Sequence, residues 1–505
     1  MSTTLPATIP DTVDLLVVGG GVNGCGIARD AVGRGLSVML VERDDIAEAT
    51  SSSSSKLIHG GIRYLETYEF RLVREALAER EVLLGIAPHI VWPMRFVLPH
   101  RPEMRPRWMI RAGLFLYDHL ARRVSLPGSE ALDLAHLPQG APLKQPEFAR
   151  GFAYSDCWVE DSRLVLLNAR DAADRGATVL TRTRFESASR AADAWTVRLL
   201  DADGTARTVR ARAIANAAGP WVIGAQGATG TALRGRVRLV RGSHIVVPAL
   251  YEGPQAYILQ NDDRRVVFVI PYEGRFSLIG TTDVPHDAAE GKPHCTPEEA
   301  AYLCEAVSRQ FRSPVAPSDI AWTYSGVRPL HDDGSDNPSA VTRDYTLSLD
   351  TAGAPLLTVL GGKITTYRRL AEDAAGRITR ALGRPGTPWT ARAPLPGGDL
   401  GGLSRDAFTE STARAHPWLP APMLERLVRT HGGELERVID GATSIEAMGG
   451  DLGGGITARE LEWMRAREWV RAPEDVLWRR TKRGLHMTHE ERNAFAARFG
   501  ELLPA

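Results

Sequence analysis

The sequence predicts a mixed α/β protein with three parts: a parallel sheet flanked by helices, an antiparallel sheet and a helical C-terminal region. Three observations carry this prediction. Residues 14–43 have the pattern of a strand, a glycine turn, a helix and a second strand. Residues 237–283 hold several short apolar strands separated by turns, and helical patterns dominate after residue 394.

The composition excludes several classes of protein. A chain of 505 residues is too long for one ordinary core, so we expect two or three domains. The 61 basic and 61 acidic residues cancel, which argues against a general nucleic-acid binder. None of the four cysteines forms a C-x-x-C pair, so we expect neither a disulfide framework nor a metal site. No apolar run approaches the ~18 residues that span a bilayer, and we expect no signal peptide.

The first segment, residues 14–43, predicts a dinucleotide-binding unit. Gly19, Gly21 and Gly24 form a G-x-G-x-x-G motif between an apolar strand and a helix. The first glycine makes the tight turn, the second lets a pyrophosphate approach the backbone, and the third lets helix and strand pack closely. Glu42 ends the next strand, where it would accept hydrogen bonds from a ribose and repel the 2′-phosphate of NADP.

The segment that follows, TSSSSSKLIHGGIRYLE, starts at Thr50. A serine run alone is typical of a linker, but this one crosses the carboxyl edge of the predicted sheet, where ligands bind in open α/β folds. Arg63 offers a planar fork for an anionic group, and Tyr64 adds a hydroxyl. Other residues of this segment are expected to contact a nucleotide cofactor: Thr50, Ser54, Ser55, Lys56, Leu57 and Gly60.

The next elements follow from periodicity and turn residues. We predict helices over residues 69–84, 161–175 and 296–311, the last opened by the capping box Thr296–Glu299. Residues 91–124, rich in proline and arginine, are predicted to be irregular. Strands are predicted over residues 178–181, 319–324 and 345–349, and residues 195–219 predict a hairpin with an Asp-Gly turn whose second strand ends at Gly219.

Residues 355–378 repeat the pattern of strand, glycine turn and helix, with Gly361 and Gly362 in the turn and Thr365 at the helix start. The glycine motif together with Arg34-Gly35 and Glu42-Arg43 resembles the FAD-binding signature of the glycine-oxidase/D-amino-acid-oxidase superfamily. This resemblance implies a Rossmann-type FAD-binding domain in which the second glycine turn points a helix N-terminus at the flavin ring. It therefore favours FAD over NAD.

A closer resemblance covers nearly the whole chain. The segments SSKLIHGGIRYLE, MRFVLPHRP, GSHIVVP, YSGVRPL and GGKITTYRRLAE are similar to those of the bacterial aerobic sn-glycerol-3-phosphate dehydrogenase family. The resemblance implies FAD-dependent oxidation of glycerol 3-phosphate to dihydroxyacetone phosphate, by hydride transfer from C2 to flavin N5. It also implies that electrons pass to a membrane quinone, and that a helical cap follows residue 394.

The implied chemistry needs cations for a phosphate and a base for a hydroxyl proton. We expect Arg328 beside C2 and its hydroxyl, and Lys363 beside the flavin or the substrate oxygen. His59 is a candidate proton acceptor, although a buried structural histidine explains it equally well. The phosphate would be held by Arg63, Tyr64 and Arg343, but a surface ion pair also explains Arg343. Thr281 is expected in the pocket; strand-end packing of Thr281-Thr282-Asp283 accounts for it about as well.

The basic, aromatic segment at residues 95–123 suits an anionic lipid surface, and equally a solvated domain connector. With the resemblance, we expect a cytoplasmic homodimer bound peripherally to the inner membrane, with no nucleic acid as partner. The alternatives are an oxidase that passes electrons to oxygen, an amino-acid oxidase, and a flavin-binding protein without turnover.

The predicted domain organisation is discontinuous. Residues 11–90, 150–235 and 352–393 would form the FAD-binding domain. Residues 91–149 and 236–351 would form the antiparallel substrate and membrane-facing domain, and residues 394–505 the C-terminal helical cap.

Overall fold

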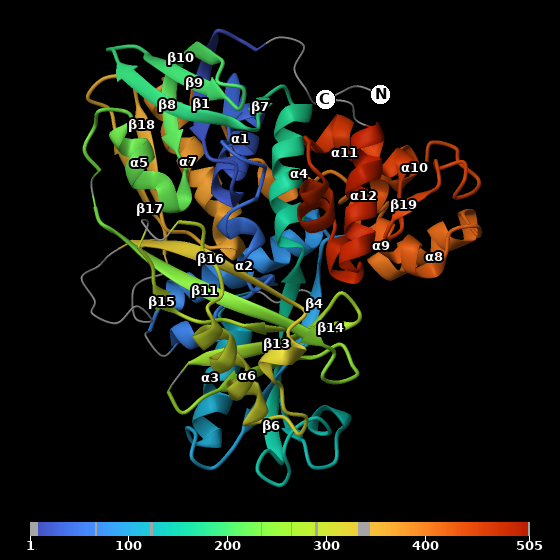
Figure 1. The fold of residues 1–505 in the computed structure, drawn as a ribbon. Helices are drawn as coiled ribbons and strands as arrows, with labels where there is room; N and C mark the ends of the chain where they lie inside the picture. The colour runs from blue at the N-terminus through green and yellow to red at the C-terminus, as the bar shows by residue number, and fades with distance from the viewer. Residues whose placement is uncertain are drawn as a thin grey trace.

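The computed structural model describes residues 9–65, 68–121, 125–233, 235–263, 265–287, 291–331 and 344–502. Its helices and strands form two large sheets and a separate helical region, drawn in red in Figure 1. The first sheet occupies the upper half of that view and the second sheet the lower half. The three predicted parts are therefore all present.

The first sheet is built around five parallel strands, in the order β18–β10–β1–β2–β7. These strands are β1 (Thr12–Val18), β2 (Val38–Val41), β7 (Thr178–Leu180), β10 (Ala206–Asn216) and β18 (Leu356–Leu360). Three antiparallel strands extend it: β8 (Thr183–Arg190), β9 (Trp195–Asp201) and β17 (Thr346–Asp350). Parallel strands buried on both faces explain why β1 and β2 are almost wholly apolar.

Three helices cover one face of this sheet through a shared apolar core. They are α1 (Val22–Gly33), α4 (Asp161–Asp174) and α7 (Tyr367–Ala381). On the other face, side chains of β9 such as Trp195 form a second core with the strands, and α5 (Val222–Gly227) lies beside it. This arrangement is the predicted Rossmann-type layer structure, and it brings the carboxyl ends of β1, β2, β10 and β18 to one edge.

The second sheet is mainly antiparallel, with the order β15–β11–β14–β13–β12–β4–β6–β3 and with β16 and β5 attached to β11 and β6. Only the pair β12 and β4 is parallel among the described strands of this sheet. The strands are β3 (Leu57–Ile58), β4 (Val91–His100), β5 (Glu130–Asp133), β6 (Arg150–Val159), β11 (Val237–Pro248), β12 (Ala256–Gln260), β13 (Val266–Tyr272), β14 (Phe276–Gly280), β15 (Val284–Pro285) and β16 (Trp322–His331).

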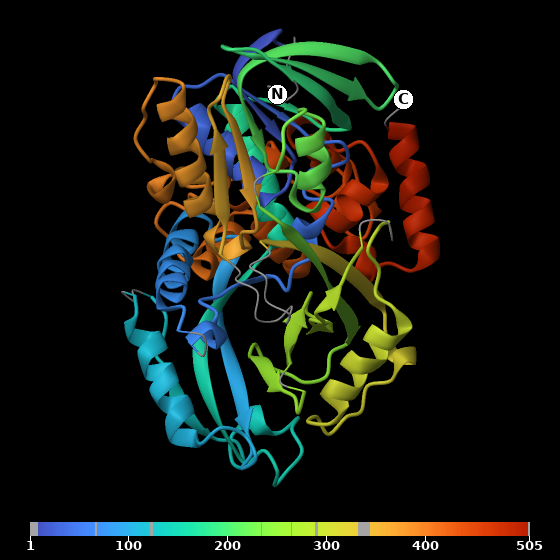
Figure 2. The same cartoon turned by 90° about the vertical axis from the view of Figure 1, so that its left-hand side faces the viewer.

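Two helices pack on opposite faces of the second sheet, as Figure 2 shows. The first, α6 (Pro297–Ser308), begins at the predicted capping box, in which the Thr296 side chain accepts from the Glu299 backbone N–H. The second, α3 (Arg107–His119), packs on the face that carries Phe96 of β4. The prediction that residues 91–124 are irregular was therefore wrong, because β4 and α3 lie within them.

The C-terminal region has its own apolar core. Its helices are α8 (Arg405–Ala415), α9 (Ala421–His431), α10 (Leu435–Ile439), α11 (Ala458–Glu468) and α12 (His489–Leu502). Buried ion pairs attach it to α4: Arg163 contacts Glu468 at 2.7 Å, and Arg170 contacts Glu434 at 2.7 Å. A helical C-terminal part was predicted, and Figure 1 shows it beside α4.

Sheet membership departs from the predicted domain division at three strands. β3 and β6 pair within the second sheet, although their residues were assigned to the FAD-binding domain. β17 pairs within the first sheet, although residues 346–350 were assigned to the substrate domain. Among the other predicted elements, α2 (Phe70–Ile86) corresponds to the helix predicted over 69–84. The strand predicted over 319–324 starts later, at Trp322, and continues to His331 as β16, because residues 317–319 form a 3₁₀ turn.

Candidate active site

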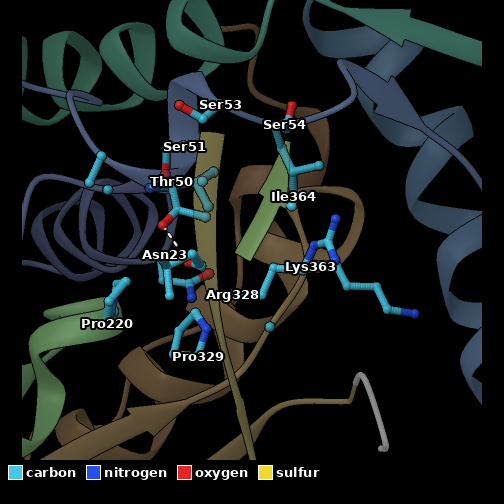
Figure 3. Close-up of a pocket in the computed structure, with 18 of the residues that line it drawn as sticks. Asn23, Thr50, Ser51, Ser53, Ser54, Pro220, Arg328, Pro329, Lys363 and Ile364 are labelled. Atoms are coloured by element: carbon cyan, nitrogen blue, oxygen red, sulfur yellow. Dashed lines mark hydrogen bonds between the residues drawn. The ribbon is translucent and has the colours of Figure 1, made fainter. Parts of the chain in front are cut away.

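A cavity of about 1370 Å³ lies where the two sheets meet. Its walls come from the carboxyl ends of first-sheet strands, from the segment that carries the serine run, and from β11 and β16 of the second sheet. Figure 3 shows the serine segment, β16 with Arg328, and the segment of Lys363 and Ile364 gathered around this cavity. Residues far apart in the sequence thus converge on one site, as the sequence predicted.

The glycine turn after β1 forms one end of the cavity. Gly19 has φ +110°, and a Cβ there would lie 2.6 Å from the Ala217 carbonyl oxygen, so a side chain is excluded. Gly21 precedes α1, whose first turn holds no acidic residue. Gly24 does not line the cavity; it allows close packing, since a Cβ there would lie 1.9 Å from the Gly19 carbonyl oxygen. The bare, positive end of α1 suits an anion.

Glu42, at the end of β2, contacts the glycine turn. Its carboxylate accepts from the Gly20 backbone N–H at 2.6 Å and from the Asp44 backbone N–H at 2.9 Å. Burial raises the pKa of this carboxyl, despite those two hydrogen bonds. Glu42 and Gly219 both line the cavity, so the pocket has an acidic group and two chain turns at this end, as predicted.

The serine segment lines the cavity and is not a linker. Thr50 donates to the Val327 carbonyl oxygen at 2.6 Å, which joins the segment to β16. Ser51 accepts from the Val22 backbone N–H at 3.0 Å, in the first turn of α1. Ser54 donates to Asp161 at 2.8 Å. These contacts tie the segment to three separate elements, and Thr50, Ser54, Ser55 and Leu57 all line the cavity.

Lys56 and Gly60 do not line the cavity, so their positions do not support the predicted direct contact with a cofactor. The Lys56 side chain is fully buried and its ammonium contacts Asp161 at 2.8 Å. Gly60 faces α2 and α3, where a Cβ would lie 2.5 Å from both the Leu77 Cδ2 and the Tyr117 hydroxyl. Sequence reasoning could not identify these structural partners, because Asp161 and Tyr117 are distant in the chain from Lys56 and Gly60.

Arg328 lies in the cavity wall on β16. Its guanidinium donates to the Thr281 hydroxyl at 2.9 Å and also to Asp283. Thr281 and Asp283 line the cavity as well, whereas Thr282 is buried and donates to Glu299 at 2.6 Å. These two contacts orient the guanidinium in the cavity wall.

Lys363 and Tyr64 contact each other in the cavity wall. The Lys363 ammonium lies 3.6 Å from the centre of the Tyr64 ring, a cation–π contact. The turn before Lys363 has φ +75° at Gly361 and φ +98° at Gly362, so both positions favour glycine. The chain then enters a short 3₁₀ turn, Ile364–Thr366, and α7. Five residues of this region line the cavity: Tyr64, Gly361, Gly362, Lys363 and Ile364.

His59 also lines the cavity, next to Thr365. The Thr365 hydroxyl accepts from the His59 backbone N–H at 3.3 Å. Two predicted phosphate ligands cannot be placed, because Arg343 and the side chain of Arg63 lie outside the described residues.

His244 is a cavity residue that the sequence did not single out. It lies on β11, stacks on Tyr324 at 4.7 Å between ring centres, and its Nε2 lies 2.9 Å from the Ser55 hydroxyl. Burial, and then the charges of Arg328 and Lys56, lower the pKa of His244 well below 6.5, so its imidazole is neutral. The only hint in the sequence was a histidine inside the apolar strand GSHIVVP.

Comparison with known proteins agrees with this geometry. The model of the "DAO: FAD dependent oxidoreductase" family matches residues 14–368. The chain belongs to this FAD-dependent oxidoreductase family. The predicted superfamily and the predicted cofactor, FAD, are thereby confirmed.

Relatives of this oxidoreductase cover almost its whole length. A glycerol-3-phosphate dehydrogenase of Pseudomonas aeruginosa is 52% identical over 95% of this chain and 94% of its own. A D-erythritol 1-phosphate dehydrogenase of Brucella abortus is 51% identical over 97% of this chain and 98% of its own. The crystal structure of a Bacillus halodurans glycerol-3-phosphate dehydrogenase complexed with FAD has a TM-score of 0.76, 26% identity, and covers 97% of this chain and 94% of its own. The resemblance to glycerol-3-phosphate dehydrogenases is confirmed.

Proposed function

We propose that this FAD-dependent oxidoreductase converts sn-glycerol 3-phosphate to dihydroxyacetone phosphate. The observation that carries the proposal is the cavity wall that holds Arg328 and Lys363 beside the glycine turns. In the reaction the C2 hydrogen leaves with both bonding electrons, the hydroxyl proton leaves to a base, and the C2–O bond becomes a carbonyl. FAD, when bound, supplies the hydride acceptor at N5.

The residues fit this cofactor. Gly19 and Gly21, at the bare N-terminus of α1, would hold the pyrophosphate, and Glu42 the ribose. The remaining proposed contacts come from the serine segment and from the two later turns: Thr50, Ser54, Ser55, Leu57, Gly219, Gly361, Gly362 and Thr365. Lys56 and Gly24 would act indirectly, by supporting the loop and the turn.

Arg328 and Lys363 would bind the substrate oxygen. As the C2 hydroxyl loses its proton, negative charge develops on that oxygen, and a guanidinium already oriented by Thr281 stabilises it without reorganisation. Arg63, Tyr64 and Arg343 are the proposed phosphate ligands. Together these groups provide the cations that a dianionic substrate requires.

The hydroxyl proton needs an acceptor, and three histidines line the cavity: His59, His244 and His286. His59 remains the predicted base, and His244 is a second candidate because its lowered pKa leaves it neutral. Ser55 fixes the ring of His244 through Nε2. To distinguish them, each histidine is replaced by asparagine and the pH dependence of kcat is measured. The fall of kcat at low pH reports protonation of the base, so it should disappear only when the true base is replaced.

The proposed function is tested by one anaerobic spectrum. Purified holoenzyme mixed with excess glycerol 3-phosphate is expected to lose the flavin absorbance near its visible maximum within the mixing time. A matched sample with glycerol serves as the control, because it lacks the phosphate. A flavin that stays oxidised with glycerol 3-phosphate contradicts the proposal and favours a flavin-binding protein without turnover.

A second substrate deserves the same assay. The relative from Brucella abortus, whose name specifies D-erythritol 1-phosphate, is about as similar as the glycerol-3-phosphate dehydrogenase. Both compounds carry a phosphate and a secondary alcohol, so the same cations suit both. A larger kcat/KM for D-erythritol 1-phosphate would assign the chain to that substrate instead.

We also propose a membrane quinone as electron acceptor, with the enzyme acting as a homodimer on the inner face of the cytoplasmic membrane. Among the described residues, no helix is long and apolar enough to span a bilayer. Support for surface binding comes from α3, which exposes Trp108 and Phe115 by 71% and 57% next to the exposed Arg111. A rate of quinone reduction that exceeds the rate of peroxide formation would identify quinone, rather than oxygen, as the electron acceptor. Sedimentation equilibrium measures whether the protein is a dimer.

Replacing Trp108 and Phe115 together by serine is expected to weaken binding to anionic phosphatidylglycerol vesicles by about 100-fold, because two aromatic side chains no longer enter the interface. Co-sedimentation at low ionic strength measures this. Leu403→Ser removes an exposed apolar side chain of the C-terminal region and is the matched control. Wild-type protein that stays in the supernatant contradicts surface binding.

A further inference from the structure

The helix α3 lies on the surface and buries few of its side chains. Among its thirteen residues only Leu114 and Tyr117 are buried. Leu114 contributes an apolar contact to the core beneath the helix. Tyr117 reaches further and ends among polar groups, which makes it the point where this surface helix meets the cavity wall.

The Tyr117 hydroxyl has one donor and one acceptor partner. It accepts from the Gly60 backbone N–H at 2.9 Å. It donates to the Asp156 carboxylate, whose two oxygens both lie at 2.8 Å. Burial, and then the negative charge of Asp156, raise the pKa of Tyr117 well above 10, so the hydroxyl keeps its proton.

Asp156 belongs both to this group and to the cavity wall. It is fully buried on β6 and contacts the Arg80 guanidinium at 2.8 Å. Its carboxylate also accepts from the Gly60 N–H, at the longer distance of 3.3 Å. Burial raises the pKa of Asp156 in spite of Arg80 and Tyr117. Arg80 in turn donates to the Ser155 carbonyl oxygen at 2.8 Å, so the group is anchored to both α2 and β6.

Gly60 lies between His59 and Gly61, and both of these neighbours line the cavity. The backbone here is held from two sides. Thr365 holds the N–H of His59 from the side of α7, and Tyr117 and Asp156 hold the N–H of Gly60 from the other side. A Cβ on residue 60 would collide with the Tyr117 hydroxyl at 2.5 Å, which explains the glycine.

We propose that Tyr117 and Asp156 are positioning residues, which fix the backbone of His59–Gly61 in the orientation that the substrate requires. The inference rests on the proposed function, since the substrate is the one named there. Neither residue is among those that we propose to contact the cofactor or the phosphate. Their effect reaches the substrate through the peptide that carries His59 and the residues following Gly61, which include the proposed phosphate ligands Arg63 and Tyr64.

This role differs from simple structural support in what it changes. A residue that only stabilises the fold would alter the thermal midpoint and the yield, with the kinetic constants of the folded enzyme unchanged. A residue that orients the substrate segment alters KM for glycerol 3-phosphate in enzyme that still holds its full complement of flavin. Measuring KM, kcat and flavin content together therefore distinguishes a positioning role from a purely structural one.

The first test is Tyr117→Phe, which keeps the ring and removes the hydroxyl. Gly60 then retains only the longer hydrogen bond to Asp156. KM for glycerol 3-phosphate is expected to rise by about tenfold, the effect of one buried hydrogen bond, with kcat within about twofold and the flavin content unchanged. Tyr257→Phe is the matched control: this buried tyrosine of β12 donates to the Gln139 carbonyl oxygen at 2.7 Å and does not line the cavity.

The second test is a double-mutant cycle with Asp156→Asn, which keeps the side-chain volume. If the two residues act as one unit, Tyr117→Phe should add little to the KM of Asp156→Asn. A KM within about twofold of wild type in Tyr117→Phe, an equal rise in Tyr257→Phe, loss of flavin from Tyr117→Phe, or additive effects would each overturn the inference. Wild-type flavin that glycerol 3-phosphate does not reduce would overturn the proposed function and this inference together.

Discussion

Replacing Arg328 by methionine is expected to lower kcat/KM for glycerol 3-phosphate by about 10²–10³ and to leave FAD bound, because one oriented donor to a developing oxyanion contributes that much. Methionine approximates the length of the lost side chain. It removes the hydrogen bond to Thr281 and the contact with Asp283. Steady-state kinetics under quinone-saturating conditions, together with the flavin-to-protein absorbance ratio, measure both parts of this expectation.

Two further variants make the Arg328 result specific. Arg328→Lys keeps a positive charge but loses the planar fork, so its kcat/KM should fall between those of wild type and Arg328→Met. Arg309→Met removes an exposed arginine directly after α6 that contacts Glu305, and it should leave kcat/KM within about twofold. Near-normal kinetics of Arg328→Met would contradict the proposed role of this guanidinium.

Asp161→Asn is expected to release FAD and to destabilise the protein by about 3 kcal/mol, because it removes the carboxylate that balances buried charge. Lys56 contacts this carboxylate at 2.8 Å, and both side chains are fully buried. Burial alone would raise the pKa of Asp161, yet the charges of Lys56 and Lys482 lower it below 3.8, so the group is ionised. The same carboxylate accepts from Ser54, which lines the cavity.

Flavin content after gel filtration and the thermal midpoint of flavin release measure the effect of Asp161→Asn. The matched control is Asp174→Asn at the other end of α4, where the carboxylate is partly exposed and contacts Arg467 at 2.5 Å. It should retain its flavin. If Asp161→Asn also kept full flavin and an unchanged midpoint, the buried ion pair would not be what supports the serine segment.

The sequence predicted the first sheet well because its signals are local. The glycine turn at Gly19 and the acid at Glu42 lie within one strand–helix–strand unit, and the unit at Gly361 repeats part of that pattern. The strand β4 was missed because it contains Pro93 and Pro99, which lower strand propensity. The two prolines are six residues apart, so their missing N–H groups point to the same edge of the strand, and pairing with β6 persists along its whole length.

The partners of several site residues could not be predicted for a different reason. The role of Lys56 depends on Asp161, and that of Gly60 on Tyr117 and Asp156, all of which are distant in the chain. His244 becomes a candidate base only through the register of β11 with β16, which sets it opposite Tyr324. Local patterns predict which backbone surrounds a nucleotide, whereas these partnerships arise from tertiary packing.

The C-terminal region has a consequence for how the holoenzyme is made. Arg480 contacts Asp45 at 2.9 Å, just before the serine segment, and Lys482 donates to Ser162 beside Asp161. The first nucleotide-binding loop is therefore supported by a residue 435 positions further along the chain. Until the C-terminal region has folded against this loop, the loop lacks these contacts, so we expect flavin to be captured stably only after the two regions have docked.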